Sequence, residues 1–178
     1  MKKKLFIFIF ICVLVGFTSE VHAEYVLPYP SVMPGNKMYK ITRVIDKLKN
    51  FWYFGNIAQI KYHLGLSDKY LVEAKTLMEY KQYLLASDAL QRSDSEFSGI
   101  VRSLRRAKAE KKDIIVLQKN IKEAAGKHAE VLSALLLLVP PEFMWTPEKG
   151  TPTELKLNYL ITGSVNIRAS VSAQISSL

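Results

Sequence analysis

The stretch that decides the fold is YLLASDALQRSDSEFSGIVRSLRRA, residues 83–107. Its apolar and small residues recur at alternating steps of three and four. They are Tyr83, Ala86, Leu90, Ser93, Phe97, Ile100, Leu104 and Ala107. This spacing places the side chains on one face of an α-helix, whereas a strand would require alternation with a period of two. The stretch therefore predicts a long amphipathic helix that buries one face.

Three more segments have the same spacing. Their stripes are Met38, Ile41, Ile45, Leu48 and Trp52; Ile57, Ile60, Leu64, Ser67, Leu71, Ala74 and Met78; and Ile114, Leu117, Ile121, Ala124, His128, Val131, Leu135 and Leu138. The pattern predicts an all-α fold of four to five antiparallel amphipathic helices, arranged as hairpins in a bundle with coiled-coil-type packing. The expected core is Ile41, Ile45, Leu48, Ile60, Leu64, Leu71, Leu90, Phe97, Leu104, Leu117, Ile121, Val131, Leu135 and Leu138.

The boundaries between these helices are marked unevenly. Asn56, after Gly55, is expected to cap the second helix. The next turn, between Met78 and Tyr83, contains no glycine or proline and is inferred from the change of phase between stripes. The bundle is expected to span residues 36–142.

Residues 143–178 predict a loop and a C-terminal helix. The sequence TPTE, residues 151–154, has a capping residue, a proline and a glutamate in the order typical of a helix start, so a helix is expected from about Pro152. From Val165 the apolar residues alternate and serines are frequent, so this tail is expected to be a fraying, poorly defined helix.

The N-terminus has the features of a secretory signal in residues 1–23. Three lysines precede the apolar run LFIFIFICVLVGF, residues 5–17, and SEVHA then offers a cleavage site after Ala23. The expected product is extracytoplasmic and lacks the chain's one cysteine, Cys12. The alternative is an uncleaved N-terminal membrane anchor. Residues 24–35 predict an extended, proline-rich spacer that ends in a type II turn at Pro34-Gly35 and in a cap at Asn36.

Three stretches resemble the exported bacterial helical domains of the family called domain of unknown function 5667. They are LPYPSVMPGNKMYKITRVIDKLKNFW, residues 27–52; LGLSDKYLVEAKTL, residues 64–77; and KHAEVLSALLLLVPPE, residues 127–142. Lys37-Met38 stands where the family often has a proline, and the region after Glu142 is more irregular than the family's final helix. The resemblance implies an extracytoplasmic α-helical domain and brings no catalytic residues.

No pattern in the sequence indicates catalysis, a metal site or a cofactor site. His63 and His128 lack the glutamate three residues earlier that helical di-iron sites use, since Ile60 and Ala125 stand there. His128 is expected to pack in the core and His63 to face solvent. Asp94 and Glu96 are expected to form a solvated acidic patch. Neither a nucleophile elbow nor a phosphate-binding glycine loop is present, so we expect a protein that is not an enzyme.

The chain carries a formal charge of +9. The expected contacts with an anionic partner come from two basic clusters: Lys40, Arg43 and Lys47 in the first helix, and Arg102, Arg105, Arg106, Lys111 and Lys112 around the end of the third. The aromatic run from Phe51 to Phe54 would form an interfacial surface with the first cluster. The favoured interpretation is instead that these aromatic side chains pack against the neighbouring hairpin.

The leading hypothesis for function is a non-enzymatic interaction or structural module at the bacterial cell envelope, with a protein partner or self-association. The alternative is peripheral binding to an anionic membrane or wall polymer through the basic clusters. Nucleic acid is not expected as a partner, because the export signal directs the chain away from it.

Overall fold

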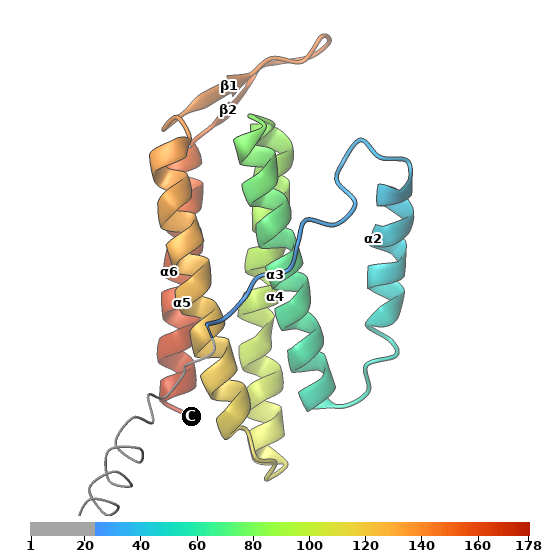
Figure 1. Cartoon of the computed structure of the whole chain (residues 1–178), viewed down its shortest axis with the longest axis vertical. Helices are drawn as coiled ribbons and strands as arrows, with labels where there is room; N and C mark the ends of the chain where they lie inside the picture. Colours follow the sequence, from blue (N-terminus) through green and yellow to red (C-terminus); the bar gives the residue numbers. More distant parts are fainter. Residues whose placement is uncertain (1–23) are drawn as a thin grey trace, which may run out of the picture.

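The computed structural model describes residues 24–178, so the signal predicted in residues 1–23 lies outside the described part. Its helices are α2 (Met38–Lys49), α3 (Asn56–Glu79), α4 (Tyr83–Ala109), α5 (Ile115–Leu138) and α6 (Leu157–Ser176). A short antiparallel pair, β1 (Phe143–Trp145) and β2 (Thr153–Leu155), stands between α5 and α6. The predicted all-α fold is confirmed (Figure 1).

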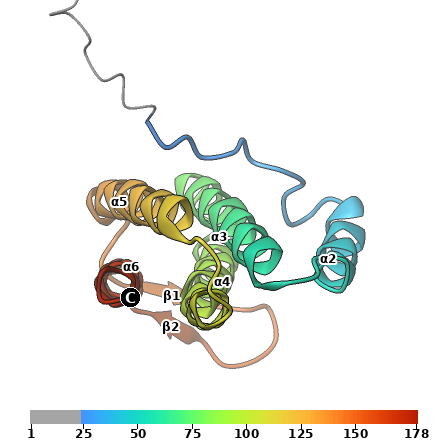
Figure 2. The same cartoon turned by 90° about the horizontal axis from the view of Figure 1, so that it is seen from below.

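Four of the helices, α3 to α6, pack side by side, and α2 stands outside them (Figure 2). Helix α3 packs on α4, α5 packs on α6, and α4 also contacts α6. The buried apolar side chains form two clusters. One surrounds Phe97 and Ile121, and the other surrounds Leu90 and Leu132. Since α6 contributes to both, the bundle extends past Glu142, the boundary expected from the sequence.

A layer of polar side chains separates the two apolar clusters. It is made of Ser67 and Asp68 on α3, Ser93 and Asp94 on α4, His128 on α5, and Ser164 and Arg168 on α6. Along each helix these residues fall between the members of one cluster and the members of the other. The core is therefore a stack of apolar, polar and apolar layers.

The core prediction is confirmed for eight residues: Ile60, Leu71, Leu90, Phe97, Leu104, Leu117, Ile121 and Leu135. Leu64 and Val131 are half-buried. It is wrong for Leu138, because Val139 takes the buried position at the end of α5. It is also wrong for Ile41, Ile45 and Leu48, which lie on a face of α2 turned away from the bundle.

Lysines in a left-handed conformation close both short turns between antiparallel helices. Lys81 has φ +58° and Lys111 has φ +56°. In the first turn, Gln82 N–H donates to the Leu77 carbonyl at 2.8 Å, as in the motif that usually places glycine at this point. The turn inferred between Met78 and Tyr83 is confirmed, and it was hard to see because lysine occupies the position that glycine would mark.

The helix start predicted at TPTE is wrong. Thr153–Leu155 forms β2, with Leu155 opposite Phe143 of β1, and α6 begins only at Leu157. The hairpin covers one end of the bundle, where the rings of Phe143 and Tyr83 pack edge to face with their centroids 4.8 Å apart. Pairing with β1 and burial of Phe143 outweigh the local preference for a helix. The tail is also more ordered than expected, since α6 is helical to Ser176.

The segment before α2 is extended, as expected, but it is not a detached spacer. It crosses the bundle, and Tyr25 and Leu27 pack against the two apolar clusters (Figure 1). The turn at Pro34-Gly35 is confirmed, with Gly35 at φ +98° and Asn36 N–H donating to the Met33 carbonyl at 3.2 Å.

Two asparagines were expected to cap helices, and only one does so. Asn36 accepts a hydrogen bond from the N–H of Met38 at 2.9 Å, so this prediction is confirmed. Gly55, at φ +88°, precedes α3 as its N-cap residue. Asn56 turns its side chain instead to Glu110 at 2.6 Å, so its predicted cap is wrong.

Candidate functional site

The polar layer inside the bundle is a closed network. Arg168 forms an ion pair with Asp94 and donates from Nη2 to Ser93 Oγ at 2.7 Å. Ser164 Oγ donates to the other Asp94 oxygen at 2.7 Å. Asp94 was expected in a solvated patch, and that prediction is wrong because α6 covers it. Since these groups bind one another, the layer holds α6 against α4.

His128 occupies the same layer and is fully buried. Its Nε2 lies 2.7 Å from Asp68 Oδ1, and Arg168 Nε donates to its Nδ1 at 3.5 Å. Because Arg168 can only donate, Nδ1 accepts and Nε2 carries the proton. Burial lowers the pKa of His128, against the opposing effect of Asp68, so the ring is neutral. The prediction of a packing histidine is confirmed.

The second histidine forms a pair near the surface. His63 Nδ1 lies 2.6 Å from Glu96 Oε2, and both side chains are about one-quarter exposed. His63 therefore lies at the surface, as expected, but it is only partly exposed, and Glu96 is paired with it instead of forming a solvated patch with Asp94. Within residues 24–178 no three histidine, cysteine or acidic side chains are grouped as a metal site.

Helix α2 turns its polar face toward the bundle. Tyr39 O–H donates to Glu73 Oε1 at 2.5 Å, and Arg92 Nη2 donates to the same oxygen at 3.3 Å. Asp46 is buried and pairs with Lys69. We call these contacts the α2 latch. They fix the rotation of α2 about its own axis.

The opposite face of α2 carries apolar side chains that nothing in residues 24–178 covers. These outer-face residues are Met38, Ile41, Val44, Ile45 and Leu48, which are 43–56% exposed. The segment that follows α2 adds Phe51, Trp52 and Phe54, which are 73–83% exposed. Phe51 also lines a hollow between α2 and the bundle, together with Asp46 and Tyr70. The expectation that the aromatic run packs on the neighbouring hairpin is wrong for Phe51, Trp52 and Phe54. Tyr53 alone follows it, stacking on Tyr62 with ring centroids 4.6 Å apart.

Positive charge borders the outer face of α2. Lys40 and Lys47, both expected contacts of an anionic partner, are exposed, as are Lys37 and Lys49. The one acidic residue of α2, Asp46, faces inward to Lys69. Arg43 does not join the lysines. It is half-buried and donates to Tyr39 O–H at 3.3 Å, so it belongs to the α2 latch.

The structure separates the second predicted basic cluster into two groups, two lysines and three arginines. Lys111 and Lys112 lie in the turn after α4, where Lys112 pairs with Glu110 at 2.7 Å. Lys112 also lines a shallow hollow next to Phe54 and Lys61. This places Lys112 beside the segment between α2 and α3, although that segment and the α4–α5 turn are far apart in sequence.

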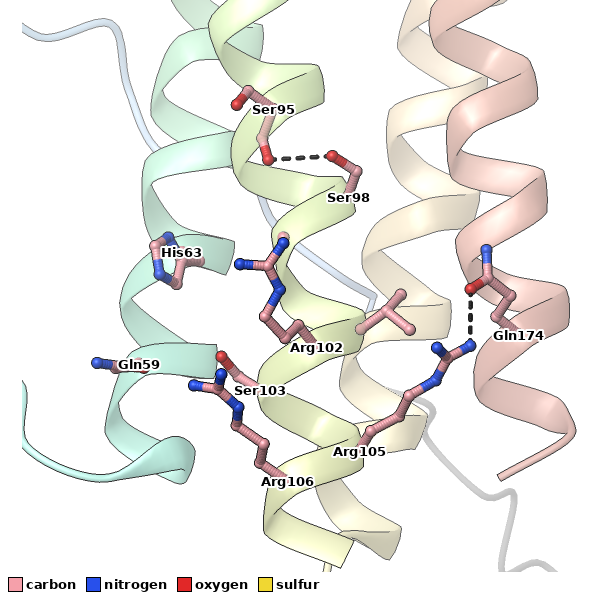
Figure 3. Close-up of a pocket in the computed structure, with 11 residues that line it drawn as sticks. Gln59, His63, Ser95, Ser98, Arg102, Ser103, Arg105, Arg106 and Gln174 are labelled. Carbon is pink, nitrogen blue, oxygen red and sulfur yellow. Dashed lines mark hydrogen bonds between the residues drawn. The ribbon is translucent and has the colours of Figure 1, made fainter.

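The three arginines of that cluster line a groove along α4, between α3 and α6. Arg102, Arg105 and Arg106 share it with residues of α3 and with Gln174 of α6 (Figure 3). Its volume is about 760 Å³. We call it the arginine groove.

Sequence reasoning missed the latch and the orientation of α2. A signal was present, because Tyr39, Arg43, Asp46 and Asn50 form a polar stripe with the same three-and-four spacing as the apolar one. The spacing predicts a helix with two faces. It does not indicate which face finds a partner within the chain.

Comparison with known proteins identifies a family but no characterised relative. The family model described as domain of unknown function (DUF5667) matches residues 31–142, so the chain belongs to this family. No curated protein and no solved structure matches. None of the helices in residues 24–178 is both long and apolar enough to cross a membrane.

Proposed function

We propose that this DUF5667 protein is a non-enzymatic module that attaches to the surface of an anionic membrane through α2. One observation carries the proposal: α2 is latched to the bundle by its polar face, so its apolar and aromatic face points outward. The signal predicted in residues 1–23 supports an extracytoplasmic location, and that location is part of the proposal.

The chemistry of the outer face favours lipid over water. Many exposed apolar side chains that lie next to one another mark an interaction site on a folded protein. Aromatic side chains such as Trp52 are enriched at the boundary between lipid headgroups and acyl chains. The helix would lie in the plane of that boundary and would insert its outer face without crossing the membrane.

The charges around the outer face favour an anionic surface. Lys37, Lys40, Lys47 and Lys49 are exposed on α2, and Asp46 is neutralised by Lys69. Lysines near an anionic bilayer contribute about 1 kcal/mol each to binding. A protein partner for the same face, the leading hypothesis from the sequence, would not need this border of lysines.

The test is co-sedimentation of the chain beginning at Glu24 with vesicles of phosphatidylglycerol and phosphatidylcholine. This chain contains the whole described core and lacks the apolar run of residues 5–17, which would bind lipid by itself. We expect binding at low salt that weakens as salt rises and that is lost with neutral vesicles. No binding to anionic vesicles at low salt would refute the proposal.

Matched variants locate the contact. Replacing Phe51, Trp52 and Phe54 by serine should reduce the bound fraction at least about tenfold, because the inserted rings are removed. Replacing the equally exposed Tyr80, Ile115 and Tyr159 by serine is the control and should have no effect. If the first variant bound like the wild type, or if light scattering showed that the outer face forms a stable dimer in solution, lipid would not be its partner.

A further inference from the structure

We infer that the arginine groove binds a chain of phosphate groups. The inference goes beyond the membrane proposal, because no residue of α2 lines the groove. It rests on the positions of three guanidinium groups, on the lack of acidic partners for them, and on the shape of the surface that they share.

The three arginines are close neighbours on one helix. Arg105 and Arg106 follow Arg102 by three and four residues, so each of them is a neighbour of Arg102 on the surface of α4. Like charges at this spacing destabilise a helix by a few tenths of a kcal/mol per pair. No ion pair within residues 24–178 offsets this repulsion, so an anion from outside the chain fits as the partner of the cluster.

Acidic side chains are absent from the lining of the groove. Among residues 24–178, none forms an ion pair with Arg102, Arg105 or Arg106. By contrast, Arg92 and Arg168 elsewhere in the bundle are paired with carboxylates. Arg105 has one protein partner, the neutral amide oxygen of Gln174 at 3.2 Å. The guanidinium groups therefore keep most of their donors for a ligand.

The arginines divide between the two sides of α4. Arg102 and Arg106 extend toward α3, where Gln59 and His63 line the groove, and Arg105 extends toward α6 (Figure 3). A single phosphate held on the α3 side would leave Arg105 without an anion. The separation of the guanidinium groups and the volume of about 760 Å³ fit a ligand with several linked anionic groups.

Guanidinium geometry favours phosphate as the anionic group. The planar fork of arginine donates two parallel hydrogen bonds to phosphate or carboxylate, which lysine does not. Phosphate offers more acceptor oxygens than carboxylate, and Gln59 and Ser103 add neutral donors on the side of Arg106 (Figure 3). A phosphate chain would satisfy this set of donors better than a polycarboxylate would.

Calorimetric titration of the chain from Glu24 with short-chain inorganic polyphosphate tests the inference. We expect saturable binding, and an R102Q/R106Q variant should bind at least about tenfold more weakly. K119Q/K122Q, which removes the same charge from exposed positions on α5, is the matched control and should bind within about twofold of the wild type. Equal weakening in the two variants would overturn the inference, because it would show non-specific attraction.

Three other probes complete the test. Orthophosphate and polyglutamate should each bind much more weakly than polyphosphate, and equal binding of either would overturn the preference for a phosphate chain. Vesicles of phosphatidylglycerol should bind R102Q/R106Q as they bind the wild type, and loss of vesicle binding would assign the groove to lipid headgroups instead. The serine variant of Phe51, Trp52 and Phe54 should keep its affinity for polyphosphate, so the two proposals can fail separately.

Discussion

Helices α2 and α6 pack against the rest of the protein in different ways. Each is amphipathic, and each places polar side chains against the rest of the protein. In α6, Arg168 enters the bundle between two apolar layers. In α2, Asp46 and Tyr39 face the bundle, and the whole apolar face is left outside. The comparison teaches that a matched polar partner can decide the orientation of a helix.

The two helices differ in what accompanies the polar contact. Arg168 is held by Asp94 while Val171 and Ile175 of the same helix join the apolar core. Helix α2 contacts the bundle through its latch and through Tyr62, whose O–H donates to the Asp46 carbonyl. Within residues 24–178, buried nitrogens of Arg43 and Arg92 in the latch lack partners. We therefore expect α6 to contribute much more than α2 to the stability of the fold.

The largest expected effect comes from breaking the polar layer at α6. Replacing Arg168 by methionine should lower the free energy of unfolding by about 3–5 kcal/mol, because Asp94 would be left without its cation. Denaturant titration measures this. The control R102M removes an exposed arginine of α4 and should change stability by no more than about 0.5 kcal/mol. A loss below about 1 kcal/mol in R168M would mean that the ion pair does not hold α6.

The same substitution in the bundle and in α2 sharpens the comparison. Leu71 is fully buried, whereas Leu48 is 53% exposed. Leu71→Ala should cost about 2–5 kcal/mol, because it leaves a cavity in the core. Leu48→Ala should cost no more than about 0.5 kcal/mol in the absence of lipid. Equal losses would show that the outer face of α2 is buried in solution.

The smallest expected effect is a pH dependence that arises from His128. Burial holds its pKa below the ordinary value of 6.5, so in acid the unfolded chain binds a proton that the folded chain does not. The free energy of unfolding should therefore fall as the pH drops below about 6.5, by up to about 1.4 kcal/mol per pH unit. Above about pH 6.5 the free energy of unfolding should no longer depend on the protonation of His128.

Comparison with a variant that lacks His128 isolates this pH dependence. Urea titrations of the wild type and of His128→Asn between pH 7.5 and 5.5 share every other titrating group. The wild type should lose more stability than the variant over this range. The same slope in both chains would mean that the folded protein takes up the proton on His128 as readily as the unfolded one.

The parts of the fold that the sequence predicts are those in which apolar spacing and packing agree. The stripe through Leu90, Phe97 and Leu104 identifies α4 and its buried face, because that face meets α3 and α6. The stripe through Ile41 and Leu48 identifies α2 but not its orientation. That orientation depends on Lys69 and Glu73, which lie on another helix and become partners only in the folded chain.

The sequence also did not predict which polar residues are buried. Arg168 and Asp94 are 74 residues apart, and neither occupies a position that marks it for burial. The arginine groove was partly foreseen, since Arg102, Arg105 and Arg106 were expected to meet an anion together. Their separation from Lys111 and Lys112 follows from the end of α4, which turns the chain away between the two groups.

The segment that crosses the bundle sets an order of events during synthesis. Tyr25 donates to Asp68, and Glu24 pairs with Lys127, which is made 103 residues later. The segment cannot reach its final place until α5 has been synthesised. Pro28 and Pro30 resist helix formation and keep it an extended chain meanwhile. The part of the described chain that is made first must therefore wait longest for its partners.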